Sequence, residues 1–189
     1  MKVILASQSP RRLALLQSAG MTVEAQPQHI DEAAMPGETV SKTVSRLSRN
    51  KAQACIADDD IPIIAADTLV NIRCKAFGQP VDLVEAKQML EQLSGQTHQV
   101  LTGIAVRLGG MIICKQVATR VTFRDLTSSE IDIYLEHNDV LDKAGAYAIQ
   151  GGAASFIESI AGPLDNVIGL PISTTVQMIE ELTAMAADR

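Results

Sequence analysis

Residues 3–12 read VILASQSPRR, and this stretch indicates how an α/β fold begins. The apolar residues 3–6 predict a short buried strand. Pro10 suits the first turn of a helix, where a missing N–H leaves no hydrogen bond unmade. Ser9 then stands at the N-cap position of that helix. The segment therefore predicts a strand, a tight turn and a helix in direct succession.

Two arginines, Arg11 and Arg12, follow in the first helical turn. A helix N-terminus already carries unpaired N–H groups and about half a positive elementary charge. Adjacent cations there are unfavourable unless an anion is bound. A phosphate chain would resolve the conflict, and the hydroxyls of Ser7 and Ser9 would complete its cradle. The alternative is a capped helix whose arginines are solvated.

The composition indicates a globular chain with a large core. It has 189 residues, 47% of them hydrophobic, no tryptophan and a net charge of −6. That length is enough for one domain, which we expect to cover residues 1–189. The negative charge argues against a nucleic-acid partner, so an anionic ligand needs a local basic cluster.

The chain carries no pattern typical of secretion or membrane insertion. Residues 3–6 are too short for the core of a signal peptide, and no apolar run approaches a membrane span. Cys55, Cys74 and Cys114 are odd in number and widely separated, which predicts reduced, buried thiols. We therefore expect a cytoplasmic protein without a membrane partner.

Hydrophobic periodicity and turn residues outline the remaining elements. Strands are expected over residues 3–6, 22–26, 61–66, 98–108, 111–124 and 155–160. Helices are expected over residues 10–19 and 40–57, between Asp82 and Gly95, and from Thr127 and Ser173 onward. Gly109 and Gly110 would join two long strands into a hairpin. This order favours an α/β fold with a mixed sheet, with room for a cleft that divides it into two lobes.

Lys51 continues an apolar stripe of its predicted helix. Val40, Val44 and Leu47 recur at helical spacing, and four residues further along the same face stands Lys51. One interpretation is a side chain that snorkels to solvent near the helix end. The other is a partly buried ammonium group that reaches a phosphate.

Two acidic residues follow predicted strands. Asp67 comes directly after the apolar run 61–66, and the carboxyl ends of strands line ligand crevices in α/β sheets. Glu32 lies in a polar loop. Each could be a solvated or turn-forming acid. If the two carboxylates converge near a basic cluster, they would suit a divalent cation whose octahedral coordination is completed by phosphate oxygens and waters.

Several common chemistries are excluded by motif. His29, His98 and His137 lack the paired spacing of metal ligands, and neither GxxxxGK[ST], GxGxxG nor GxSxG occurs. The Gly/Ala-rich stretch 144–154 would let backbone approach a ligand closely, or it is a plain flexible loop.

Seven segments together resemble the Maf family of nucleoside triphosphate pyrophosphatases. They are LASQSPRR (5–12), IDE (30–32), RNKA (49–52), AADTLV (65–70), SGQTHQVLTG (94–103), LDKAGAYAIQG (141–151) and NVIGLP (166–171). They occur in the family's order over nearly the whole chain.

The resemblance implies a central mixed, twisted sheet flanked by helices, with two lobes around a deep cleft, similar to inosine triphosphate pyrophosphatases. It also implies a homodimer. The implied activity is hydrolysis of a nucleoside triphosphate to the monophosphate and pyrophosphate, with Mg²⁺ or Mn²⁺ as cofactor.

Residue roles carry over onto matching positions only. By resemblance, the triphosphate would be held by Ser7, Arg11, Arg12 and Lys51. Glu32 and Asp67 would bind the metal, and Asp67 would also accept the proton of the attacking water.

The resemblance extends to one branch of the family. Thr68, Gln150 and Arg12 match the branch that acts on dTTP and UTP, whereas a 7-methyl-GTP branch carries glutamine after the aspartate and glutamate near position 150.

Two positions depart from the family pattern: Gln79 replaces the lysine of a GKP motif, and Ala148 replaces a glycine. The alternatives are a pyrophosphatase for another modified nucleotide, such as 7-methyl-GTP, and a non-catalytic nucleotide-binding regulator of septum formation.

Overall fold

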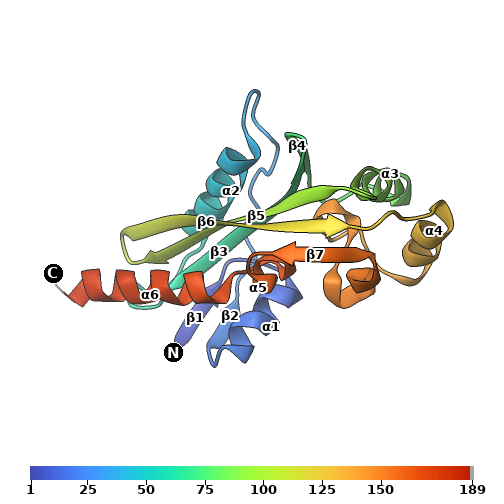
Figure 1. Cartoon of the computed structure of the whole chain (residues 1–189). Helices are drawn as coiled ribbons and strands as arrows, with labels where there is room; N and C mark the ends of the chain where they lie inside the picture. Colours follow the sequence, from blue (N-terminus) through green and yellow to red (C-terminus); the bar gives the residue numbers. More distant parts are fainter. Residues whose placement is uncertain (188–189) are drawn as a thin grey trace. The chain divides into compact units, whose positions relative to one another are not determined.

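A computed structural model describes residues 1–187 and shows strands interspersed with helices along the chain (Figure 1). The strands are β1 (Lys2–Leu5), β2 (Thr22–Ala25), β3 (Ile63–Ile72), β4 (Lys75–Phe77), β5 (Thr97–Leu108), β6 (Met111–Phe123) and β7 (Ile157–Ala161). The helices are α1 (Pro10–Ser18), α2 (Val40–Ala54), α3 (Leu83–Leu93), α4 (Ser128–His137), α5 (Leu164–Ile168) and α6 (Ile172–Ala187). None of these helices is long and apolar enough to cross a membrane.

The strands form one mixed sheet in the order β2-β1-β3-β5-β6-β7, with β4 paired to β3. β1 runs parallel to both β2 and β3, whereas β4 is antiparallel to β3 and β7 is antiparallel to β6. β5 and β6 are neighbours joined by a two-residue turn, which makes them a hairpin. The predicted α/β fold with a mixed sheet flanked by helices is confirmed.

The chain divides into two compact units. Unit 1 comprises residues 1–67, 102–117 and 169 onward, and unit 2 comprises residues 68–101 and 118–168. β3, β5 and β6 each contribute residues to both units.

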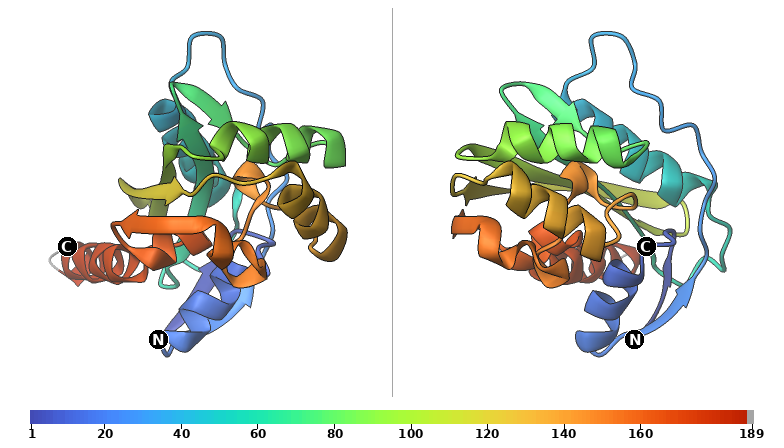
Figure 2. Two further views of the ribbon diagram at one scale, coloured as in Figure 1. Left: turned by 45° about the vertical axis from the view of Figure 1, so that its right-hand side comes forward. Right: turned by 90° about the vertical axis from the view of Figure 1, so that its right-hand side faces the viewer.

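Each unit has its own apolar core. In unit 1, β1, β3 and α6 contribute buried side chains that include Leu5, Ile64 and Met178. In unit 2, α3 packs beside α4 (Figure 2). The core of unit 2 includes His98, whose Nε2 lies 2.8 Å from the hydroxyl of Tyr147, and burial lowers the pKa of His98 to about 4.

Three predicted helix starts are confirmed together with their capping residues. Ser9 accepts a backbone N–H at the start of α1, and Asp82 does so at the start of α3. Thr127 and Glu130 form a reciprocal capping box at α4. Local hydrogen bonding sets these boundaries, which is why the sequence reveals them.

Two predicted boundaries are wrong. The strand that begins at Ile63 does not end at Asp67 but continues to Ile72, because its second half pairs with β4. The last helix begins at Ile172, so Ser173 lies inside the first turn and the carbonyl of Pro171 accepts the N–H of Thr175.

Two further predictions are corrected by burial. Only Cys55 is buried, whereas Cys74 lies exposed in the turn between β3 and β4, and Cys114 lies exposed on β6. The stretch 144–154 is not a plain loop but falls in three 3₁₀ turns, Ala144–Ala146, Ile149–Gly151 and Ala153–Phe156. Apolar contacts of Ala146 and Ala153 with the core of unit 2 fix these turns.

Gly103 on β5 allows α2 to lie directly against the sheet. A Cβ atom at this position would stand 2.3 Å from the backbone carbonyl oxygen of Val44, which is far inside contact distance. Because backbone rather than a flexible side chain occupies that space, the distance between α2 and β5 depends on this glycine. Gly103 therefore sets the distance between α2 and the sheet, and with it the position of Lys51.

Replacing Gly103 with alanine should destabilise the protein by about 1–3 kcal/mol, because the added methyl group must push α2 outward. Urea denaturation followed by circular dichroism measures the change. Gly110→Ala is the matched control, since nothing lies within 4 Å of the Cβ it would add. Equal stabilities of the two variants would contradict this account of the packing.

Candidate functional site

The side chain of Lys51 is buried and points to two carboxylates. Its Nζ lies 2.8 Å from Oδ1 of Asp67 and 2.8 Å from Oε1 of Glu32. Lys51 and Asp67 are only 8% and 7% exposed. Snorkelling to solvent, one of the two interpretations of the apolar stripe, is therefore wrong. The buried ammonium of the other interpretation is present, with two acids as its partners.

Three different elements deliver these groups. Lys51 comes from the buried face of α2, Asp67 from the middle of β3, and Glu32 from the segment between β2 and α2. The carboxylate of Glu32 is the most exposed, with 56% of its side chain accessible. The group is thus closed on the side of α2 and β3 and open on the side of Glu32.

Arg12 turns back from α1 instead of extending into solvent. Its Nε donates to the carbonyl of Gly169 at 2.9 Å, and its Nη1 donates to Oγ of Ser7 at 3.1 Å. The same Ser7 oxygen accepts the N–H of Ser9 at 3.2 Å. Ser7 and Arg12 are therefore part of one hydrogen-bonded turn, and solvated arginines do not describe Arg12.

Arg12 also lies within the electrostatic influence of the acids. Burial lowers the pKa of Arg12, the charge of Asp67 opposes this, Arg11 lowers it further and Glu32 raises it. Arg11, Arg12, Glu32 and Asp67 therefore form one charged neighbourhood.

The structure brings most of the predicted site residues together within unit 1. These are Ser7, Arg11, Arg12, Glu32, Lys51 and Asp67. The other two belong to unit 2. Thr68 follows Asp67 in β3 and is half-buried, and Gln150 is exposed in the 3₁₀ turn Ile149–Gly151.

One contact at the site was not predicted from the sequence. Gly169 stands 157 residues after Arg12 and accepts its Nε–H through a backbone carbonyl. A backbone acceptor leaves no mark in residue type, and no local pattern links two positions so far apart. Gln79, at the position where the family has lysine, donates its amide to the carbonyl of Asp142 in unit 2 at 3.2 Å.

Comparison with known proteins places the chain in a family. A sequence model described as Maf-like protein matches residues 2–182. This chain belongs to the Maf family. A relative from Latilactobacillus sakei named dTTP/UTP pyrophosphatase is 44% identical over 94% of this chain and 98% of its own. A relative of the same name from Geobacter sulfurreducens is 42% identical over 97% of this chain and 98% of its own.

Comparison with solved structures finds a partial match. The Staphylococcus aureus Ham1 protein matches with a TM-score of 0.46 and 13% identity, covering 66% of this chain and 73% of that one. This partial overlap adds nothing to the Maf assignment.

The two carboxylates of this Maf chain are oxygen donors of the kind that a divalent cation takes. Within residues 1–187, no group of three or more His, Cys, Asp or Glu side chains could hold a metal ion. Glu32 and Asp67 nevertheless offer hard oxygen donors on either side of a cationic group, the ammonium of Lys51. Mg²⁺ is commonly held by one or two carboxylates together with phosphate oxygens and waters, so this donor set suits it.

Replacing Lys51 with methionine should lower the free energy of unfolding by about 3 kcal/mol, because Asp67 would remain as a buried charge without its ammonium partner. The loss should be smaller in the Asp67→Asn background, where no such charge remains. Urea denaturation of the two single variants and the double variant measures this coupling.

The matched control is Lys115→Met. Lys115 pairs with Glu181 at 2.8 Å in the same unit, but both side chains are more than 40% exposed. Its removal should change stability by less than about 1 kcal/mol. An equally small effect at Lys51 would show that the buried pair does not stabilise the fold.

Proposed function

We propose that this chain hydrolyses dTTP and UTP to the nucleoside monophosphate and pyrophosphate. The observation that carries the proposal is the buried Lys51 held between Asp67 and Glu32, in the same unit as Arg12 and the start of α1. The names of the relatives at 42–44% identity support the choice of substrate.

The cationic groups suit a triphosphate. The N-terminus of α1 presents backbone N–H groups, with Arg11 and Arg12 in its first turn and the Ser7 hydroxyl beside it. Lys51 adds a third charged donor. Such donors bind phosphate oxygens strongly, and in a preorganised site they stabilise the negative charge that develops on a leaving pyrophosphate.

The acids suit the hydrolytic step. A water oxygen forms a bond to the α-phosphorus while the bond from that phosphorus to the bridging oxygen breaks. Pyrophosphate leaves with the electron pair, and the carboxylate of Asp67 accepts the proton of the water. When bound by Glu32 and Asp67, Mg²⁺ or Mn²⁺ would lower the pKa of water and offset phosphate charge.

Base selection is assigned to Gln150 and Thr68. A thymine or uracil presents a carbonyl, an N–H and a second carbonyl along one edge, and an amide side chain can both donate to and accept from that edge. Gln150 is exposed in the 3₁₀ turn Ile149–Gly151, so its amide is accessible to a ligand.

We further infer that the enzyme acts as a homodimer in the cytoplasm. The dimer follows from the family resemblance. The free cysteines Cys55, Cys74 and Cys114 suit a reducing compartment. The targets include normal and modified pyrimidine triphosphates, in keeping with a role in clearing unwanted nucleotides.

A panel of nucleoside triphosphates should show release of pyrophosphate rather than orthophosphate, with dTTP and UTP preferred over other bases and over 7-methyl-GTP. Turnover should require Mg²⁺ or Mn²⁺ and stop with a chelator.

Asp67→Asn should lower kcat by at least about 10²-fold and remain folded by circular dichroism. Wild-type binding without turnover would favour the regulator, and near-native turnover of Asp67→Asn would refute the role of Asp67.

Gln150→Glu should lower kcat/KM for dTTP by at least about tenfold, because a carboxylate cannot donate a hydrogen bond to the pyrimidine edge. Steady-state kinetics on dTTP and 7-methyl-GTP, with a thermal melt, separate base selection from folding. Gln88→Glu is the control, since it makes the same charge change at an exposed position of α3. Equal losses in both variants would remove Gln150 from base recognition.

A further inference from the structure

Glu32 lies in a long segment that lacks helix and strand. Residues 26–39 connect β2 to α2, and most of them are exposed. Holding a carboxylate in place on such a segment requires its backbone to be ordered, which costs conformational entropy at every ordered residue. The segment must therefore be fixed by contacts outside the carboxylate itself.

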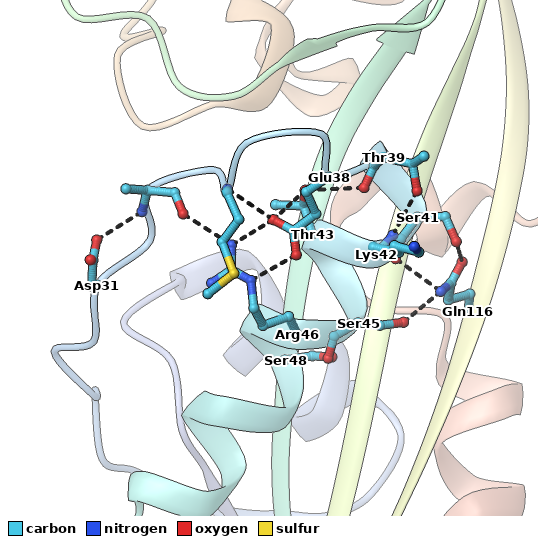
Figure 3. Close-up of polar contacts among 12 residues, drawn as sticks. Asp31, Glu38, Thr39, Ser41, Lys42, Thr43, Ser45, Arg46, Ser48 and Gln116 are labelled. Atoms are coloured by element: carbon cyan, nitrogen blue, oxygen red, sulfur yellow. Dashed lines mark hydrogen bonds and ion pairs between the residues drawn. The ribbon is translucent and has the colours of Figure 1, made fainter.

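The contacts come from Arg46 on α2 and Glu38 at the end of the segment (Figure 3). Nε of Arg46 donates to Oε1 of Glu38 at 2.8 Å, and Nη2 donates to Oε2 at 2.8 Å. This is a two-pronged pair whose side chains are only 16% and 8% exposed. Such fork-shaped pairs fix orientation as well as distance.

The pair reaches both backbone and side chains of its surroundings. Nη2 of Arg46 also donates to the carbonyl of Ala33 at 3.0 Å. Oε2 of Glu38 accepts the hydroxyl of Thr43 at 3.1 Å and the N–H of Met35 at 3.3 Å. The hydrogen bonds from Arg46 hold the pKa of Glu38 at about 2, so the pair is charged at neutral pH.

One helix therefore holds both sides of Glu32. Arg46 holds the carbonyl of Ala33, the next residue in the chain, and Lys51 holds the Glu32 carboxylate. Arg46 and Lys51 are separated by five positions on α2. The backbone next to Glu32 and the side chain of Glu32 are thus both held by the same helix, α2.

We propose that Arg46 is a positioning residue: through Ala33 and Glu38 it holds residues 31–38 so that the Glu32 carboxylate stays beside Asp67 for a divalent cation. This inference rests on the proposed function. Residues that orient metal ligands typically contribute 10–100-fold to metal affinity.

Arg46→Met keeps much of the side-chain length and removes every donor. It should raise the Kd for Mn²⁺, measured by calorimetry without nucleotide, by about tenfold or more. Amide hydrogen exchange in residues 33–38 should accelerate by a similar factor. At saturating Mn²⁺, kcat for dTTP should stay within about threefold of wild type, because Arg46 contacts none of the groups assigned to chemistry.

Gln116→Ala is the matched control. Gln116 on β6 accepts the hydroxyl of Ser41 at 2.8 Å, donates to the Ser41 carbonyl at 3.0 Å and also donates to Ser45 (Figure 3). It anchors α2 without contacting residues 31–38, so its removal should leave both Mn²⁺ affinity and exchange in 33–38 unchanged. Equal effects of the two variants would show that Arg46 merely stabilises α2.

Two other results overturn the proposal in different ways. Wild-type Mn²⁺ affinity and exchange in Arg46→Met would refute the positioning role while leaving the proposed function intact. A wild-type protein that binds no Mn²⁺ but releases pyrophosphate would refute the positioning role together with the metal site. Absence of turnover with normal Mn²⁺ binding would refute the proposed function alone.

Discussion

Burying a charged group is costly unless it is paired, and the ammonium group of Lys51 is buried between two carboxylates. Its pairing with Asp67 and Glu32 requires α2, β3 and the segment before α2 to meet at one point. Separating the partners of a buried ion pair is strongly destabilising, because it leaves a buried charge without a partner. The positions of α2, β3 and the segment before α2 therefore depend on one another. The close packing of α2 on β5 at Gly103 meets the same requirement, because α2 must lie near the sheet for Lys51 to reach β3.

Arg12, at the start of α1, is a second charged group that needs partners. Arg12 carries a positive charge where a helix dipole disfavours it. The carbonyl of Gly169 and the hydroxyl of Ser7 receive its donors, and the acids nearby counter the effect of burial on its pKa. The structure therefore tolerates this arginine through neutral and anionic oxygens of its own before any phosphate is involved.

Features governed by local forces could be predicted from the sequence. The caps of α1, α3 and α4 and the β5–β6 hairpin follow from residue type and spacing. The same spacing places Lys51 on the apolar face of α2 but leaves open whether its ammonium group is buried or reaches solvent. Features governed by distant partners could not. β3 passes Asp67 because β4 pairs with its second half, and no pattern around residue 67 records that pairing. The bidentate pair of Glu38 and Arg46 joins an irregular segment to a helix, where no periodicity applies.

The charges at the site also bear on why a metal ion would be needed. Arg11, Arg12 and Lys51 bring three positive charges, and Glu32 and Asp67 bring two negative ones, within a chain whose net charge is −6. One net positive charge is too little to offset a triphosphate tail. Glu32 and Asp67 would hold a divalent cation that supplies the missing positive charge. Lys51 would then be available to the phosphates, which connects its buried position in the fold to the binding role proposed for it.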